Sequence, residues 1–298
     1  MRIFVTGSTG FIGSAVVREL LDAGHQVLGL TRSDAGVAAL IAAGAEPHRG
    51  SLEDLESLRS GAASADGVIH LAFNHDFSKF VANCEADRRI IEILASPLAG
   101  SDRPLIVTSG TGVATVVSGE PAIEETPPVN SSIIPRAASE EAANLAGTRG
   151  VNVSIVRLPQ VHDEQKQGLI SYAIPLARAK GVSPYIGDGL NRWAAAHISD
   201  VARLYRLAIE RRVSGSVYHA VGEEGVTMRE IAEVIARGLK IPAVSLAPDQ
   251  SAAHFGWLAM FAGHDMPASS KKTQEQLGWT PTGPGLIADL ERMDYSEV

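Results

Sequence analysis

The chain has 298 residues, of which 45% are hydrophobic and 20% charged, and its formal net charge is −8. The acidic balance argues against a nucleic-acid-binding surface, which needs a basic face, and the single cysteine excludes an internal disulfide framework and a cysteine-based zinc site. No apolar run approaches the ~20 residues that span a bilayer, so we expect a cytoplasmic protein that binds neither nucleic acid nor membrane.

Short apolar strands alternate with helical segments over the first 160 residues. Strands are expected at 3–5, 26–30, 46–49, 67–71, 104–108 and 153–157, and helices at 14–23, 35–43, 52–59, 77–95 and 136–148. This spacing is typical of crossover units, which build a parallel sheet with helices on both faces. The pattern predicts a doubly wound α/β domain over residues 1–160.

The regular alternation of strands and helices ends after Pro159. Helices are expected at 167–180, from about 199, and at 227–239, where Thr227 and Glu230 have the spacing of a capping box, and a strand is expected at 216–221. The apolar run 254–261 is interpreted as a core helix, with pocket lining as the alternative. We expect residues 161–298 to form a smaller α/β lobe over the carboxyl edge of the sheet, with an interleaved boundary.

A glycine-rich loop separates the first strand from the first helix. In Thr6–Gly13, Gly7 permits a tight turn, Gly10 lets the backbone approach a pyrophosphate, and Gly13 lets helix and strand pack closely. The alternative is a turn without a ligand. The location favours dinucleotide binding, by the residues Gly7, Thr9, Gly10, Phe11, Ile12 and Gly13.

Several motifs share this context: 68–72 (VIHLA), 105–109 (LIVTS), 157–159 (RLP), 197–202 (HISDVA) and 277–279 (LGW). With the glycine loop, they resemble the short-chain dehydrogenases/reductases of the extended or atypical type, which are related to nucleotide-sugar epimerases and dehydratases. The resemblance implies a Rossmann-type cofactor domain and a C-terminal substrate lobe. It also implies cofactor contacts at Ser51, Leu52, Leu71, Ala72 and Phe73.

The end of the second strand bears on the choice of cofactor. Members that prefer NAD place an acidic residue there, whereas this chain has Thr31 followed by Arg32, with Asp34 one or two residues late. An arginine fork suits a 2′-phosphate. We therefore expect NADP, with NAD as the alternative; Arg32 could also be an exposed loop residue.

The catalytic pair of the family is missing. The resemblance implies a tyrosine and, four residues later, a lysine on the helix after the fifth strand, but these positions hold Arg136 and Glu140. Arginine does not give up a proton near neutral pH. We expect Glu140 to form an i,i+4 ion pair on the helix, and Arg136 to point toward the nicotinamide, where it could bind a carboxylate or polarise a carbonyl.

Other side chains could replace the missing chemistry. Ser109 and Thr111 follow the fifth strand and could bind a substrate oxygen or serve only the turn. His75 and His162 are candidate proton donors with a suitable intrinsic pKa, or could satisfy local backbone groups. Asp76 is a candidate N-cap for helix 77–95. The histidine spacing shows no metal pattern, and no metal is expected.

Three functions remain open at this point. The first is an NAD(P)-dependent oxidoreductase that reduces a small carbonyl compound with a substitute proton donor. The second is a catalytically silent cofactor-binding redox sensor or protein partner, and the third is a sugar-nucleotide epimerase or dehydratase. We further expect Tyr172 and Tyr185 to close the substrate pocket, Arg192 to form a surface salt bridge, and a homodimer to form through helices 77–95 and 136–148.

Overall fold

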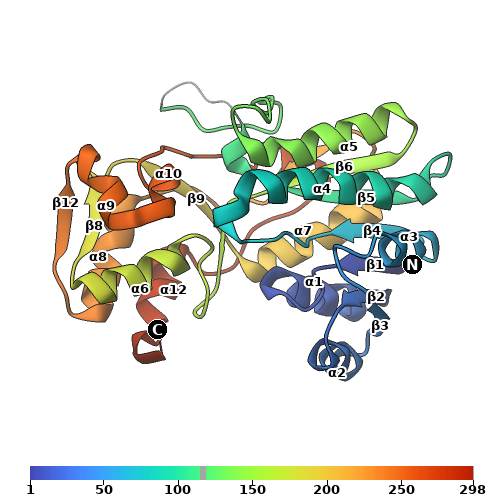
Figure 1. Ribbon diagram of the computed structural model, residues 1–298, viewed down its shortest axis with the longest axis horizontal. Helices are drawn as coiled ribbons and strands as arrows, with labels where there is room; N and C mark the ends of the chain where they lie inside the picture. Colours follow the sequence, from blue (N-terminus) through green and yellow to red (C-terminus); the bar gives the residue numbers. More distant parts are fainter. Residues whose placement is uncertain (115–118, 298) are drawn as a thin grey trace.

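A seven-stranded parallel sheet forms the larger lobe of the computed structural model, which describes residues 1–114 and 119–297 (Figure 1). Its strand order is β10-β6-β5-β4-β1-β2-β3. The strands are β1 (Arg2–Thr6), β2 (Gln26–Thr31), β3 (Glu46–Arg49), β4 (Gly67–His70), β5 (Pro104–Gly110), β6 (Asn152–Leu158) and β10 (Val217–His219). The expected Rossmann-type parallel sheet is confirmed.

Helices cover both faces of this sheet, because its strands are apolar on both sides. One core packs α1, α2 and α7 against the sheet, and the other packs α3, α4 and α5. Figure 1 shows α4 and α5 side by side; a homodimer through these two helices stays a prediction. The helices are α1 (Phe11–Asp22), α2 (Asp34–Ala43), α3 (Leu55–Ala63), α4 (Phe80–Ala95), α5 (Ala138–Thr148) and α7 (Ile198–Arg211).

The strand order places the functional edge of the sheet. The chain winds outward from β1 through β2 to β3, then returns to β4 on the other side of β1. Ligands of open α/β folds bind outside the carboxyl ends of the strands at such a switch point. The loops after β1, β4 and β5 therefore face the candidate site.

The smaller lobe lies at this edge, on the left in Figure 1. A three-stranded sheet, β11-β9-β7, and a two-stranded sheet, β12-β8, form its frame. The lobes are interleaved, since β10, a strand of the large sheet, and α7, which packs against that sheet, both follow residue 160. The elements are β7 (Gln160–His162), α6 (Ile170–Lys180), β8 (Ser183–Ile186), β9 (Arg192–His197), β11 (Glu223–Thr227), α8 (Met228–Leu239), β12 (Ala243–Leu246), α9 (Ser251–Phe255), α10 (Ala259–Ala262), α11 (Lys271–Leu277) and α12 (Leu286–Arg292).

Local capping explains where several elements depart from expectation. The helix predicted at 52–59 begins only at 55, because Asp54 accepts from the backbone N–H of Ser57. Asp76 caps the 3-10 turn η1 (Phe77–Lys79) that precedes α4, and not α4 itself. The single helix predicted at 254–261 is wrong, since Gly256 at φ 55° breaks it into short segments. The capping box of Thr227 is confirmed.

Candidate active site

The glycine loop has the backbone geometry that close packing requires. Gly7 has φ +70°, and a Cβ atom there would lie 2.8 Å from the backbone nitrogen of Ala72. A Cβ atom on Gly13 would lie 1.9 Å from the carbonyl oxygen of Gly7. These two contacts bring α1 against the carboxyl ends of β1 and β4, so larger residues would push the helix away.

The N-terminus of α1 is open toward the cleft. Gly10 is the N-cap residue, and within the described part of the chain no side chain caps this helix. A Cβ atom at Gly10 would approach only the carbonyl oxygen of Gly7, at 3.2 Å. The first-turn N–H groups and the positive end of the helix dipole therefore suit a phosphate, so the loop fits a dinucleotide.

We predict that Gly10→Val weakens binding of the dinucleotide by at least about tenfold, because the side chain enters the space that the pyrophosphate needs. The measurement is calorimetric titration, with circular dichroism to verify folding. Gly222→Val is the control, since this exposed glycine lies outside the cleft lining, has no positive φ, and a Cβ atom there would come no closer than 3.5 Å to any non-neighbouring residue. Unchanged affinity in a folded Gly10→Val variant would show that the loop is not the phosphate site.

The far end of the cleft carries the candidate ribose contacts. Arg32 lies exposed in the lining after β2, whereas Asp34 lies outside the lining and pairs with Arg49. Ser51 accepts a hydrogen bond from the backbone N–H of Glu53, at 3.2 Å. The Ser51 hydroxyl, the backbone N–H of Glu53 and the charge of Arg32 each favour the ionised carboxyl of Glu53 and lower its pKa, against a smaller effect of burial. Arg32 thus lies at the surface of the cleft, close enough to Glu53 for its charge to act on that carboxyl.

Two hydroxyl groups at the carboxyl end of β5, those of Ser109 and Thr111, line the cleft. The Oγ atom of Ser109 is buried and has no hydrogen-bond partner among the described residues. Thr111 donates a long hydrogen bond of 3.5 Å to the carbonyl oxygen of Leu158. An unpaired buried hydroxyl is costly unless a ligand satisfies it, so Ser109 is the better candidate to bind a substrate oxygen.

Arg136 also lines the cleft, and a buried carboxylate positions it. Its Nη1 atom lies 3.0 Å from Oδ2 of Asp87, and its Nη2 atom donates to the carbonyl oxygen of Thr108 at 2.9 Å. Its guanidinium lies 4.3 Å from the ring centre of Phe73. Only 17% of the Arg136 side chain is exposed. The held guanidinium lines the cleft, and its direction toward the nicotinamide stays a prediction.

Asp87 also connects Arg136 to the phosphate loop. Its Oδ1 atom lies 3.0 Å from Nε2 of His70, and Nδ1 of His70 lies 2.7 Å from the hydroxyl of Thr6. Burial alone would raise the pKa of Asp87, but His70, Arg136 and the hydrogen bonds lower it to about 2. Neither Asp87 nor His70 was among the predicted site residues. The only available signal was a histidine inside an apolar strand, which needs a buried polar partner.

Glu140 does not form the ion pair with Arg136 that the sequence analysis expected. It points into the protein and binds Arg157 on β6 through two hydrogen bonds of 2.8 Å each. Both side chains are 1% exposed. The prediction was wrong because Arg157 has no other carboxylate within salt-bridge distance in the described chain, whereas Arg136 finds Asp87.

The two candidate histidines have different environments. His75 lies in the cleft lining, exposed, with its ring 5.3 Å from that of Phe73. Partial desolvation and the nearby charge of Arg136 lower the pKa of His75, against smaller opposing contributions from the Phe73 backbone and Asp87. His75 is thus in reach of the cleft as a proton donor.

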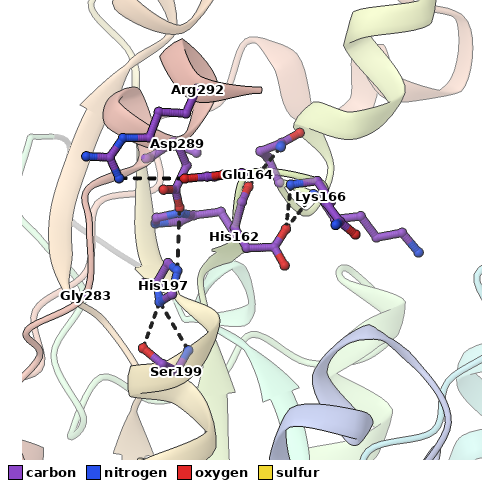
Figure 2. A network of polar contacts seen from close by, with 12 residues as sticks. His162, Glu164, Lys166, His197, Ser199, Gly283, Asp289 and Arg292 are labelled. Atoms are coloured by element: carbon purple, nitrogen blue, oxygen red, sulfur yellow. Dashed lines mark hydrogen bonds and ion pairs between the residues drawn. The ribbon is translucent and has the colours of Figure 1, made fainter. Parts of the chain in front are cut away.

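His162 lies outside the cleft lining and has no exposed surface. Figure 2 shows it with Asp289 and His197, where α12 meets the β7–β9 sheet. Its Nδ1 atom lies 2.7 Å from Oδ2 of Asp289, and burial lowers its pKa despite that carboxylate. Because it is buried and lies outside the cleft, we withdraw His162 as a proton donor.

No group of three or more His, Cys, Asp or Glu in the described chain could hold a metal ion.

All the other predicted site residues line one cleft of about 2140 Å³. Tyr172 lies in this lining, but Tyr185 packs in the core of the smaller lobe and does not close the pocket. Arg192 pairs with Asp265 at 2.8 Å, as the sequence analysis expected. The predicted site residues that the cleft brings together are Gly7, Thr9, Gly10, Phe11, Ile12, Gly13, Arg32, Ser51, Leu52, Leu71, Ala72, Phe73, His75, Ser109, Thr111 and Arg136.

No helix in residues 1–114 and 119–297 is long and apolar enough to cross a membrane.

Known proteins share this architecture. The model of the NAD dependent epimerase/dehydratase family matches residues 3–221. The chain is 47% identical to an uncharacterized protein of Schizosaccharomyces pombe, over 99% of this chain and 100% of that protein. It is 42% identical to an uncharacterized protein of Saccharomyces cerevisiae, over 99% of each. The dTDP-glucose 4,6-dehydratase DesIV of Streptomyces venezuelae, solved with NAD and TYD, has a similar fold, with a TM-score of 0.79, 22% identity, and coverage of 100% of this chain and 97% of that one.

Proposed function

The chain belongs to the NAD dependent epimerase/dehydratase family, and from this premise we propose that it is an NADP-dependent oxidoreductase that reduces a small carbonyl compound. The observation that carries the proposal is that Ser109, whose hydroxyl has no partner among the described residues, and Arg136, which donates to the carbonyl oxygen of Thr108, line the same cleft as the glycine loop. Together they form a donor set for one oxygen atom at the carboxyl end of β5.

The chemistry of this donor set suits a carbonyl oxygen that gains negative charge. When bound, the reduced nicotinamide supplies a hydride, two electrons with one hydrogen, to the carbonyl carbon. Ser109 and Arg136 stabilise the charge that develops on the oxygen. His75 then gives a proton to that oxygen, which balances the reduction of a C=O bond to an alcohol. Asp87 keeps Arg136 in place throughout.

The epimerase and dehydratase chemistry of the family finds less support. The tyrosine position holds Arg136, and the lysine position holds Glu140, whose carboxylate is turned away toward Arg157. A bound nucleotide sugar would also need a partner for its phosphates. Arg192 of the smaller lobe, which could otherwise bind such a phosphate, already pairs with Asp265.

The test is oxidation of NADPH by the purified protein over a panel of aldehydes and ketones. We expect turnover of at least one member. Tight binding of NADPH without turnover of any member would favour the redox sensor or protein partner instead. Interconversion of a nucleotide sugar with no net change in the cofactor would favour the epimerase.

We predict that the protein binds NADPH more tightly than NADH, and that Arg32→Ala reduces this preference by roughly tenfold, because a charge-assisted fork to the 2′-phosphate is lost. Glu53→Gln is the matched control, since removal of the opposing carboxylate should preserve or increase the preference. Calorimetric titration with both cofactors measures it. Equal affinities for NADPH and NADH in the wild type would contradict the assignment.

A further inference from the structure

A set of aromatic side chains lines the part of the cleft next to Arg136. We call it the aromatic collar, and it consists of Phe73, Phe77, Phe80, Tyr172 and Phe261, all of which line the cleft. The rings form a continuous chain of contacts: Phe77 lies 5.7 Å from Phe80 and 6.0 Å from Tyr172, and Phe80 lies 6.5 Å from Phe261. The collar draws on the loop after β4, on η1 and α4, and on α6 and α10 of the smaller lobe.

The collar is unusual for this chain in composition and burial. Only 5% of all residues are aromatic, yet four of the seven phenylalanines lie in the collar. None of its rings is fully buried, and Tyr172 is 41% exposed. Large apolar rings left open at a cleft are a mark of a ligand site, because only a ligand removes them from water.

The collar is also braced from outside. Trp257 stacks on Phe77 with ring centres 4.1 Å apart and planes 8° from parallel. The rings of Tyr172 and Trp257 form an edge-to-face pair with their centres 5.1 Å apart. These contacts join η1 of the large lobe to the smaller lobe across the cleft. The collar is therefore a preformed wall and not a set of loose side chains.

The polar donor set lies at one end of this wall. The guanidinium of Arg136 is 4.3 Å from the ring centre of Phe73, and the ring of His75 is 5.3 Å from the same ring. A ligand in the collar would thus present its apolar body to the rings and an oxygen to Arg136. A flat aromatic group suits these rings best. Offset-stacked and edge-to-face ring pairs attract one another more strongly than the burial of apolar area alone accounts for.

We infer that the substrates of this site are aromatic carbonyl compounds, in which the collar holds an aryl ring and the carbonyl carbon attached to it lies at Arg136. The inference rests on the proposed function and names its substrate class. The two electrons and the proton move as in the proposed reduction, from NADPH and from His75, and the product is an aryl alcohol.

The experiment compares acetophenone with cyclohexyl methyl ketone, which has a similar shape and the same carbonyl group but a saturated ring. Ligand-observed NMR titration of the protein with NADP⁺ gives both dissociation constants without turnover. We expect acetophenone to bind on the order of three- to tenfold more tightly. Phe261→Leu should reduce this discrimination, and Tyr172→Phe, which keeps the ring, should preserve it. Both variants should retain their affinity for NADP⁺, which verifies the fold.

Equal affinity for the two ketones, or full discrimination in Phe77→Leu and Phe261→Leu alike, would overturn the inference. So would saturable binding of UDP-glucose with no binding of acetophenone. Failure of the proposed function gives a different result. Selective binding of acetophenone that depends on the collar, without oxidation of NADPH by any carbonyl, would support the aromatic ligand class and overturn the reductase.

Discussion

Replacement of Glu140 by alanine should lower the free energy of unfolding by about 3–5 kcal/mol, because it leaves the charge of Arg157 buried without its partner. Both side chains are 1% exposed and are joined by two hydrogen bonds. Among the described residues, Arg157 then keeps the carbonyl oxygen of Thr126 at 2.9 Å and a contact with His219 at 3.3 Å, and neither carries a compensating negative charge. Urea denaturation of the wild type and the variant measures the difference.

Two variants separate this effect from general helix destabilisation. Glu92→Ala makes the same change at an exposed position of α4 and should alter stability by no more than about 0.5 kcal/mol. Replacement of both Glu140 and Arg157 by methionine removes the buried charges together, and should be less destabilising than Glu140→Ala. A loss below about 1 kcal/mol in Glu140→Ala would show that Arg157 reaches water or another anion.

The sequence predicted those features that depend on neighbouring residues. The strand–helix alternation is encoded segment by segment, so the parallel sheet could be derived from it. The glycine loop is likewise local, since Gly7 and Gly13 act within one turn and the helix that follows. The Rossmann fold and the position of the loop in the cleft therefore agree with the sequence analysis.

Partners that are distant along the chain could not be derived in this way. Arg136 and Glu140 stand four residues apart, which favours a local ion pair, but each binds a residue on another element. Asp87 and Arg136, which form an ion pair, are 49 positions apart in the sequence, and the hydrogen-bonded residues His162 and Asp289 are 127 positions apart. The helix propensities and spacings of a sequence carry no information on such pairs, which depend on how α4, α5 and α12 pack.

The last step of the proposed reduction is the transfer of a proton to the substrate oxygen. Replacement of the residue that donates this proton should have the largest effect on catalysis. If His75 donates the proton, His75→Asn should lower kcat/KM by a factor on the order of 10²–10⁴. A histidine donates only when protonated, so kcat/KM should fall as the pH rises through its pKa. Desolvation and Arg136 lower that pKa, so the fall should be centred below the ordinary value of 6.5.

The charge of Arg136 gives this assignment a second and independent readout. Arg136→Gln should reduce the rate, and it should also move the fall in kcat/KM to higher pH, because a positive charge next to His75 is removed while Asp87 remains. His25→Asn is the matched control, since His25 lies outside the cleft lining and pairs with Glu210. If His75→Asn keeps full activity and the same pH profile while Tyr172→Phe loses both, the phenol of Tyr172 becomes the donor. If neither variant loses activity, the proton comes from water, and the polarisation of the carbonyl by Arg136 carries the catalysis.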